Sequence, residues 1–326
     1  MSDFWKGKNV FVTGADGFIG SWVAKELVGR KANVTVIVRD IKKEACFDLH
    51  GLRPKVNVVQ GDIVDLAVLE RSIAEYEVGY VFHLAAQAIV GIANKSPLST
   101  FESNIKGTWN VLEACRKKES VKGLVVASSD KAYGVQEKLP YTEDSPLLGT
   151  YTYDASKACA DILAKSYFAT YGLPVAITRN ANTYGGADMN FSRIVPDAIR
   201  CLIKNETFNI RSNGEPERDY MYVKDAASSY LALAENISRK EVRGGAFNFG
   251  TETPIRVVEL FKKIAKIFGK PSATVKILNE SRNEIPRQYL STEKARKILG
   301  WKPAYSLDGG LKETIDWYKL YFKTKN

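Results

Sequence analysis

The sequence predicts an α/β protein with a doubly wound parallel sheet and a smaller C-terminal lobe. Short apolar runs rich in β-branched residues recur along the first 180 residues, and the segments between them are long enough for helices. These runs are apolar throughout instead of alternating, which is typical of strands that helices cover on both faces. The predicted strands are Asn9–Thr13, Val34–Val38, Val56–Val59, Val81–Leu84, Leu124–Ala127 and Val175–Thr178.

The rhythm of strands and helices changes after Arg179. Turn-forming stretches such as 184–186 and 212–214 become frequent, which indicates a second lobe, and Phe247–Gly250 predicts a strand that returns to the first sheet. We expect residues 1–180, with the strand near 246–250, to form one domain, and residues 181–326 to form mainly a lobe for substrate. The predicted helices are Ser21–Gly29, Arg193–Ile203, Asp225–Glu235, Val257–Phe268, Thr292–Leu299 and Leu311–Tyr321.

The composition is that of a folded protein, because 45% of the 326 residues are hydrophobic and 26% are charged. The sequence shows neither a signal peptide nor an apolar run of bilayer length, so we expect a cytoplasmic protein without membrane contact. The formal net charge of +10 comes from basic residues spread along the chain, which argues against a nucleic-acid partner. Cys46, Cys115, Cys159 and Cys201 lack CxxC spacing, so neither a metal site nor a disulfide framework is expected.

Three glycines follow the first predicted strand. Gly14, Gly17 and Gly20 have GxxGxxG spacing, with Phe18 and Ile19 between the last two, and they open the predicted helix. Glycine there permits a tight turn, close approach of the backbone to a pyrophosphate and packing of helix on strand, while the helix N-terminus offers N–H donors. The motif therefore predicts a bound dinucleotide and a Rossmann domain.

Charged residues follow the second and third predicted strands. Asp40 lies twenty residues beyond Gly20, where a carboxylate can bond the ribose hydroxyls of NAD. Arg39 would instead hold the 2′-phosphate of NADP, so both cofactors stay open, and Asp40 favours NAD. Asp62 either reaches the adenine or caps the following helix.

A second group of polar residues follows the fifth predicted strand and opens the next helix. Ser129 ends the strand, and Tyr153 and Lys157 are four apart, which puts them on one helix face. A neighbouring ammonium favours a phenolate, so we expect Lys157 to lower the pKa of Tyr153 from about 10 toward neutrality. Such a phenolate can take a hydroxyl proton while hydride leaves the same carbon. The alternative is an ordinary exposed tyrosine and lysine.

Together these motifs resemble those of the extended short-chain dehydrogenase/reductase family of nucleotide-sugar epimerases and dehydratases. The match covers nearly the whole chain. In chain order, its motifs after the glycine loop are Gly61-Asp62-Ile63, His83-Leu84-Ala85-Ala86, Asn104-Ile105-Lys106-Gly107-Thr108, Tyr153 with Lys157, Arg179-Asn180-Ala181-Asn182-Thr183-Tyr184-Gly185 and Arg218-Asp219-Tyr220-Met221-Tyr222-Val223-Lys224-Asp225.

The resemblance implies roles for individual residues. Ser129 would bond the sugar O4, Tyr153 would be the base at that oxygen, and Lys157 would contact Tyr153 and the nicotinamide ribose. Asn182 and Arg218 would face the sugar and the diphosphate. Further cofactor contacts are implied at Ile63, Leu84, Ala85, Ala86 and Asn104, and further substrate contacts at Arg193 and Arg282. The resemblance also implies a homodimer formed through two helices.

The pair after Ser129 separates the reactions of this family. Asp130 and Lys131 can supply the acid and the base that a 4,6-dehydratase needs, whereas 4-epimerases usually carry small or apolar residues there. The pair resembles that of CDP-glucose 4,6-dehydratases. We therefore expect an NAD-dependent enzyme that converts a nucleotide-hexose to its 4-keto-6-deoxy form. A 4-epimerase is the alternative, a non-catalytic dinucleotide sensor is the third, and the pair itself can form an ion pair without catalytic consequence.

Overall fold

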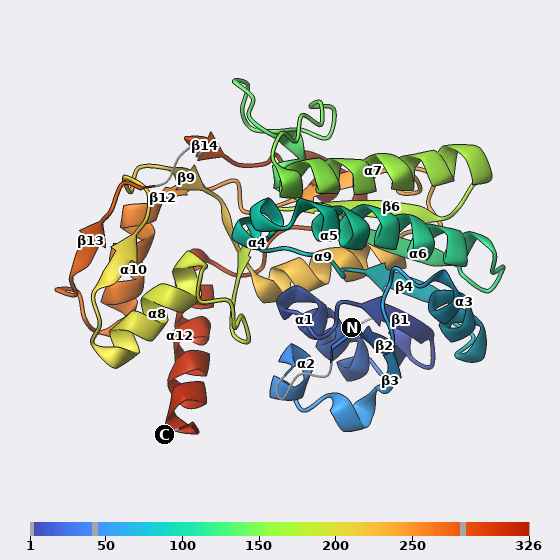
Figure 1. Cartoon of the computed structure of the whole chain (residues 1–326), viewed down its shortest axis with the longest axis horizontal. Helices are drawn as coiled ribbons and strands as arrows, with labels where there is room; N and C mark the ends of the chain where they lie inside the picture. The colour runs from blue at the N-terminus through green and yellow to red at the C-terminus, as the bar shows by residue number, and fades with distance from the viewer. Residues whose placement is uncertain (1–2, 41–44, 281–284, 326) are drawn as a thin grey trace.

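The computed structural model describes residues 3–40, 45–280 and 285–325 and shows a sheet domain beside a smaller lobe (Figure 1). Within these residues seven parallel strands form one sheet of order β11-β6-β5-β4-β1-β2-β3. The strands are β1 (Asn9–Thr13), β2 (Asn33–Val38), β3 (Asn57–Gln60), β4 (Tyr80–His83), β5 (Gly123–Ala127), β6 (Val175–Asn180) and β11 (Ala246–Phe249). The strand order reverses between β1 and β4, which confirms the predicted doubly wound fold.

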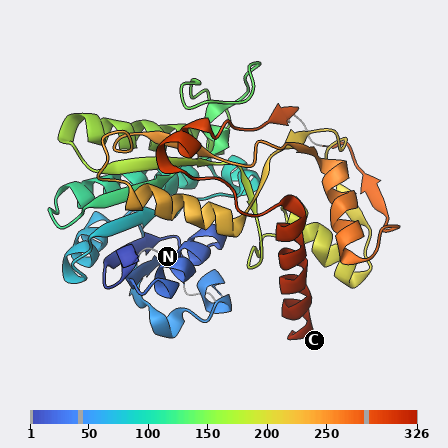
Figure 2. The same ribbon diagram turned by 180° about the vertical axis from the view of Figure 1, so that it is seen from behind.

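Helices cover both faces of this sheet (Figures 1 and 2). α6 packs between α3 and α7 on one face, and α9 packs against α1, β5 and β6 on the other. The helices of this part are α1 (Phe18–Gly29), α2 (Cys46–Leu49), α3 (Leu66–Glu75), α4 (Val90–Lys95), α5 (Pro97–Phe101), α6 (Gly107–Arg116), α7 (Thr152–Tyr171) and α9 (Val223–Glu235), with the short turns η1 (Asp3–Trp5), η2 (Arg53–Lys55), η3 (Glu102–Lys106) and η4 (Asp130–Tyr133). None of the helices in the described ranges has the length and apolar character needed to cross a membrane.

Successive residues of β1 pack into different parts of the core. Val10 and Val12 belong to one apolar cluster and Phe11 to another, because neighbouring side chains of a strand point to opposite faces. All five residues of β5 and all six of β6 are buried. Two covered faces thus explain why the strand sequences are apolar without alternation.

Short strands and four helices of the described chain build the rest of the molecule. β9 (Glu217–Arg218) lies between β12 (Ile255–Arg256) and β14 (Arg287–Gln288), while β10 (Tyr220–Tyr222) pairs with β7 (Asn182–Tyr184) and β8 (Phe208–Ile210) with β13 (Val275–Ile277). The helices are α8 (Ile194–Lys204), α10 (Val257–Phe268), α11 (Glu293–Leu299) and α12 (Leu307–Lys323). α10 packs on α8 and α12, and α11 packs on β11 of the large sheet.

Three helices begin earlier than predicted, and one of them is α9, which begins at Val223 instead of Asp225. α1 begins at Phe18 instead of Ser21, so the last glycine of the motif lies in its first turn. α12 begins at Leu307 instead of Leu311, because the Ser306 hydroxyl accepts a hydrogen bond from the Gly309 N–H group (3.1 Å). Gly310 lies so close to Tyr222 that a Cβ on residue 310 would be 2.9 Å from the tyrosine ring. This close packing explains why α12 contains a glycine although glycine disfavours helices.

Candidate active site

The glycine loop joins β1 to α1 at the carboxyl end of the sheet. Gly14 has a φ of +74°, and a Cβ there would lie 2.6 Å from the backbone nitrogen of Ala85. A Cβ on Gly20 would collide with the carbonyl oxygen of Gly14. Both positions therefore need glycine, and the loop leaves its main chain open to a ligand.

A cavity of about 570 Å³ borders this loop. Its lining contains Gly14, Gly17, Phe18, Ile19, Gly20, Arg39, Asp40, Asp62, Ile63, Leu84, Ala85, Ala86, Tyr153 and Lys157. A cavity at the N-terminus of α1, walled by bare glycine backbone, has the form that a dinucleotide pyrophosphate requires.

Two carboxylates engage Arg39 at the ends of β2 and β3. Its Nε and Nη2 donate to Asp40 Oδ2 (2.9 and 2.8 Å), and its Nε lies 4.0 Å from Asp62 Oδ2. A 2′-phosphate beside Arg39 would meet both carboxylates, so this end of the cavity suits ribose hydroxyls better. Asp62 also accepts a hydrogen bond from the Val64 N–H group (3.1 Å), whereas Asp65 caps α3.

Asn104 does not line the cavity, contrary to the expectation of a cofactor contact. It is buried in η3, and its amide oxygen accepts from the Gln87 N–H group (2.7 Å) while its amide nitrogen donates to Ser156 Oγ (2.9 Å). Its side chain is thus occupied in fixing the cavity wall near Gln87 to helix α7.

The residues of the reactive group meet where β5, η4 and α7 converge. Ser129, Asp130, Lys131 and Tyr153 line one cavity of about 450 Å³, and Tyr153 also lines the cavity beside the glycine loop. The Lys157 ammonium donates to the Ala127 carbonyl (2.8 Å). The sequence-predicted residues of the reactive group are therefore brought together at one edge of the sheet.

The pKa of Tyr153 differs from the expectation. Burial raises the pKa of Tyr153 to about 12, and the hydrogen bond with Ser129 only partly opposes this rise. Burial also lowers the pKa of Lys157 to about 8. Adjacency of Lys157 does not bring the phenol toward neutrality, because desolvation of the phenolate outweighs the favourable interactions around it.

Asp130 and Lys131 form a partly shielded pair. Lys131 Nζ lies 3.7 Å from Asp130 Oδ2, and Asp130 Oδ1 accepts from the Ser129 hydroxyl (3.0 Å). Burial is the largest cause that lowers the pKa of Lys131, and Arg218 acts in the same direction, whereas Asp130 and Asp154 oppose them. The surroundings thus move Lys131 toward the neutral amine that a base requires.

Three further residues join this group that the sequence analysis did not select. Gln288, on β14, accepts a hydrogen bond from Lys131 Nζ. Asp154 is buried, and desolvation raises its pKa to about 6. Asn180 lines the reactive cavity with an amide that has no hydrogen-bond partner in the described part of the chain. Asp154 directly follows Tyr153, and Asn180 lies in the motif at 179–185, so the sequence offered a signal for both, whereas Gln288 stands in no motif.

The predicted substrate residues line a third cavity of about 440 Å³, which shares Lys131 and Arg193 with the reactive cavity. Asn182, Arg193, Arg218 and Asp154 are in its wall. Arg193 Nη1 pairs with Asp188 Oδ2 (3.0 Å), and Arg218 Nη1 donates to the Glu217 carbonyl (2.8 Å). Arg282 lies outside the described residues.

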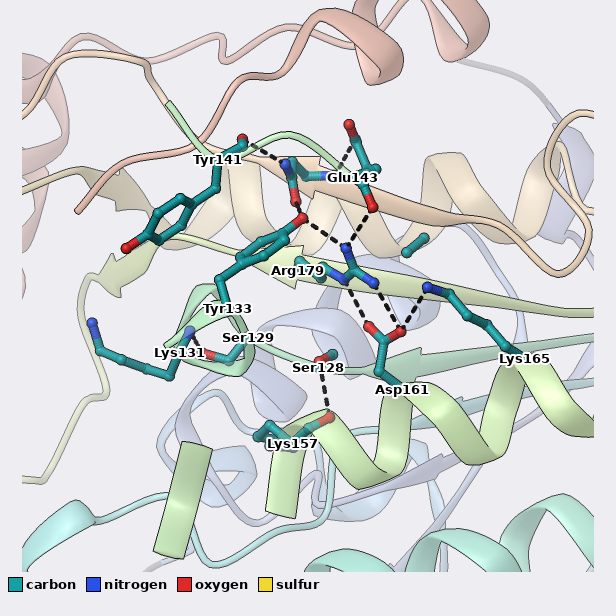
Figure 3. A network of polar contacts seen from close by, with 12 residues as sticks. Ser128, Ser129, Lys131, Tyr133, Tyr141, Glu143, Lys157, Asp161, Lys165 and Arg179 are labelled. Atoms are coloured by element: carbon teal, nitrogen blue, oxygen red, sulfur yellow. Dashed lines mark hydrogen bonds and ion pairs between the residues drawn. The ribbon is translucent and has the colours of Figure 1, made fainter. Parts of the chain in front are cut away.

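A buried polar network lies behind the reactive turn (Figure 3). Arg179 on β6 pairs bidentately with Asp161 on α7 (2.7 and 2.9 Å), and its Nη1 donates to Tyr133 Oη (2.7 Å). Tyr133 ends η4, the turn that carries Asp130 and Lys131. The network therefore holds strand, helix and turn together beneath the site.

Fold and site together define a dinucleotide-binding α/β enzyme class. The model of the NAD dependent epimerase/dehydratase family matches residues 10–250, and the chain belongs to this family. The family is NAD-dependent, and its members that resemble this chain modify nucleotide sugars. These matches confirm the family predicted from the motifs.

Relatives in the family include dehydratases and epimerases. The CDP-glucose 4,6-dehydratase of Salmonella typhimurium is 30% identical over 98% of this chain and 93% of its own length. A trifunctional UDP-glucose 4,6-dehydratase/UDP-4-keto-6-deoxy-D-glucose 3,5-epimerase/UDP-4-keto-L-rhamnose-reductase of Arabidopsis thaliana is 31% identical over 96% of this chain, which spans about half (47%) of that protein.

Solved structures similar to this chain also include both epimerases and dehydratases. A UDP-glucose 4-epimerase of Thermotoga maritima with UDP-glucose has a TM-score of 0.88 and 29% identity, covering 96% of this chain and 99% of that one. A dTDP-glucose 4,6-dehydratase of Streptomyces venezuelae with NAD bound has a TM-score of 0.88 and 26% identity, covering 97% and 98%. Overall similarity therefore does not separate the two reactions.

Proposed function

We propose that this protein is a nucleotide-sugar 4,6-dehydratase that uses internally recycled NAD. The observation that carries the proposal is the placement of Asp130 and Lys131 in the cavity that also contains Ser129 and Tyr153. An epimerase needs a group that exchanges a hydroxyl proton at C4, whereas loss of water from C5 and C6 needs an additional base and acid. The Salmonella typhimurium relative supports CDP-glucose as the first substrate to test.

The cavity beside the glycine loop fits NAD. Gly14 and Gly20 leave room for the pyrophosphate, and the carboxylates of Asp40 and Asp62 favour a ribose with free hydroxyls. When bound, NAD would accept the hydride from C4, return it at C6, and add a positive charge that favours the Tyr153 phenolate. Denaturing the purified protein and assaying the released dinucleotide tests this assignment, and NADP in place of NAD would contradict it.

Tyr153 and Ser129 would act on the C4 hydroxyl. The Tyr153 oxygen would take the hydroxyl proton, while Ser129 would hold the same oxygen in place through its own hydroxyl. Ser129 already lowers the pKa of Tyr153 in part, and the Lys157 ammonium is held nearby by the Ala127 carbonyl. Lys157 would hold the nicotinamide ribose on the same side.

Lys131 and Asp130 would then remove water. A ketone at C4 acidifies the C5 hydrogen, so the neutral Lys131 amine can take that proton and the C5 electrons form a double bond to C6. The C6 hydroxyl leaves as water when protonated Asp130 donates to it. The lowered pKa of Lys131 supports its assignment as the base, and the acid role of Asp130 rests on its place beside Lys131 in the same cavity.

The cations of the third cavity would bind the diphosphate. Arg218 and Arg193 face the hollow from β9 and from the N-terminus of α8, and Asn182 adds an amide for the sugar. Guanidinium groups bind phosphate through paired N–H donors, which matches a nucleoside diphosphate.

A homodimer would form through the outer face of α5, α6 and α7, in which α7 lies alongside both α5 and α6 (Figure 1). Leu98 on α5 is 73% exposed and Ile162 on α7 is 56% exposed, and Phe101 on α5 and Trp109 on α6 are exposed too. Large apolar side chains gathered on one face are typical of a protein interface.

A labelled substrate tests the reaction. CDP-glucose and the UDP, dTDP and GDP hexoses, each with deuterium at C4, are incubated with the protein in light water, and the products are analysed by mass and NMR. Dehydration predicts a 4-keto-6-deoxy product with the label at C6, and Asp130→Asn and Lys131→Met should slow this product after the first oxidation. A label retained at C4 of an inverted sugar, with the C6 hydroxyl intact, would establish an epimerase.

A further inference from the structure

Gln288 is 157 positions from Lys131 in the chain, and the two side chains are in contact. It is the last residue of β14 and is completely buried (0% exposed). The chain after it is fixed, because the Tyr141 N–H group donates to the Tyr289 carbonyl (3.1 Å) and the Ser291 N–H group donates to the Tyr141 carbonyl (2.8 Å). Its side chain therefore has a defined place against turn η4.

Both ends of the Gln288 amide bind the acid–base pair. The amide oxygen accepts a hydrogen bond from Lys131 Nζ, and the amide nitrogen donates to the main-chain carbonyl of Asp130 (3.0 Å). Because a glutamine amide has one donor end and one acceptor end, these two contacts fix its orientation. The position of Lys131 Nζ is then set relative to the main chain of its own turn.

We propose that Gln288 is the positioning residue for Lys131 in the elimination step, a role that rests on the proposed dehydratase function. An amide oxygen accepts a hydrogen bond from an amine and from an ammonium alike, so Gln288 can orient Lys131 without requiring its charged form. A carboxylate at this place would orient the side chain equally well, but it would stabilise the ammonium and weaken the base.

The charges around Lys131 make a neutral partner important. Asp130 on η4 and Asp154 on α7 favour the ammonium, whereas Arg218 on β9 and burial favour the neutral amine. A third negative group in direct contact would shift this balance to the ammonium. Gln288 supplies the contact and adds no charge, so it leaves the balance between the ammonium and the neutral amine of Lys131 unchanged.

The same strand pair carries a substrate residue. Gln288 is the register partner of Arg218 in the pairing of β14 with β9, and Arg218 lines the third cavity. β9, which carries Arg218, is therefore paired with β14, whose residue Gln288 contacts Lys131. This pairing gives a direct route by which the second lobe orders the base of the reaction.

Two variants of Gln288 separate orientation from charge. Gln288→Glu keeps the shape and adds a carboxylate, so the pH profile of elimination should move to higher pH by at least about one unit. Gln288→Leu removes the contact, so the kcat of elimination should fall at least about tenfold at every pH. In both variants the first oxidation and the KM should change little. Arg287→Gln is the control, because it changes the net charge by the same amount on an exposed neighbouring residue paired with Glu217.

A full elimination rate in Gln288→Leu, or equal displacement of the profile in Gln288→Glu and Arg287→Gln, would overturn the proposal. If the wild-type protein dehydrates no nucleotide hexose, the proposed function fails by itself. The contact is then read from NMR of lysine labelled with ¹³C at Cε. The Lys131 signal, assigned by its loss in Lys131→Arg, should titrate at higher pH in Gln288→Glu than in Arg287→Gln, and identical titrations would disprove the contact.

Discussion

The phenol oxygen of Tyr153 carries the first chemical step of the proposed reaction. Tyr153→Phe removes this oxygen and leaves the ring in place, so turnover should fall about 100-fold or more while the affinity for a nucleotide hexose changes little. The comparison requires steady-state rates and calorimetric titration of both proteins. Undiminished turnover in the variant would remove Tyr153 from the chemistry.

The raised pKa of Asp154 predicts that this carboxyl group stabilises the folded state more at low pH than at neutral pH. Its pKa rises from 3.8 to about 6 on folding, because burial disfavours the carboxylate. The folded state thus binds the proton more tightly, and this contribution to stability is present below pH 4 and is lost as the pH rises through 6. Asp154→Asn should therefore gain stability over wild type at pH 7.5, by about 2 kcal/mol, and lose this advantage at low pH.

Denaturant unfolding of wild type and Asp154→Asn between pH 4 and pH 7.5 measures this difference. Asp316→Asn, which removes an exposed carboxylate from α12, controls for the loss of one negative charge. A stability difference between Asp154→Asn and wild type that does not change with pH would show that Asp154 is not desolvated as the fold implies.

The elements that local pattern defines could be predicted, whereas contacts across the chain could not. The strand runs predicted the sheet, and the glycine loop and the Tyr153–Lys157 spacing predicted residues that line one cavity, because each pattern is encoded within a few neighbouring residues. Gln288 lies on a two-residue strand whose register with Arg218 no periodicity reveals. The pKa of Tyr153 was predicted in the wrong direction, since a sequence shows the neighbouring lysine but not the extent of burial.

The pairing of β6 with α7 through Arg179 and Asp161 gives a test at the scale of the elements. Both side chains are completely buried, so Arg179→Met leaves the Asp161 carboxylate with Lys165 (3.2 Å) as its one cationic partner among the residues that the structure describes. Loss of one member of a buried pair costs about 3–5 kcal/mol, whereas replacement of both by apolar groups costs much less. Arg179→Met should therefore lower the free energy of unfolding strongly, and Arg179→Met/Asp161→Leu should recover most of it. Additive losses in a double-mutant cycle would contradict the coupling.

The two parts of the molecule have complementary tasks in the proposed reaction. The large sheet supplies the glycine loop, Ser129 and Tyr153, and the smaller lobe supplies Arg218 and Gln288. Lys131 lies where they meet, because it lines both the reactive cavity and the cavity that contains Arg218. Lys131 has its contacts with Gln288 and its neighbour Arg218 only when the second lobe is folded against the sheet.

The outer face of α5, α6 and α7 gives the last prediction, which concerns the assembled protein. Ile162→Lys places a charge at an exposed apolar position of α7, and burying that charge without a partner in an interface would cost several kcal/mol. We expect wild type to sediment as a dimer and Ile162→Lys as a monomer at the same concentration. Ile277→Lys, at an exposed apolar position (49%) on β13 in the other lobe, should remain a dimer. Sedimentation of wild type as a monomer, or equal dissociation of both variants, would show that this face is not the interface.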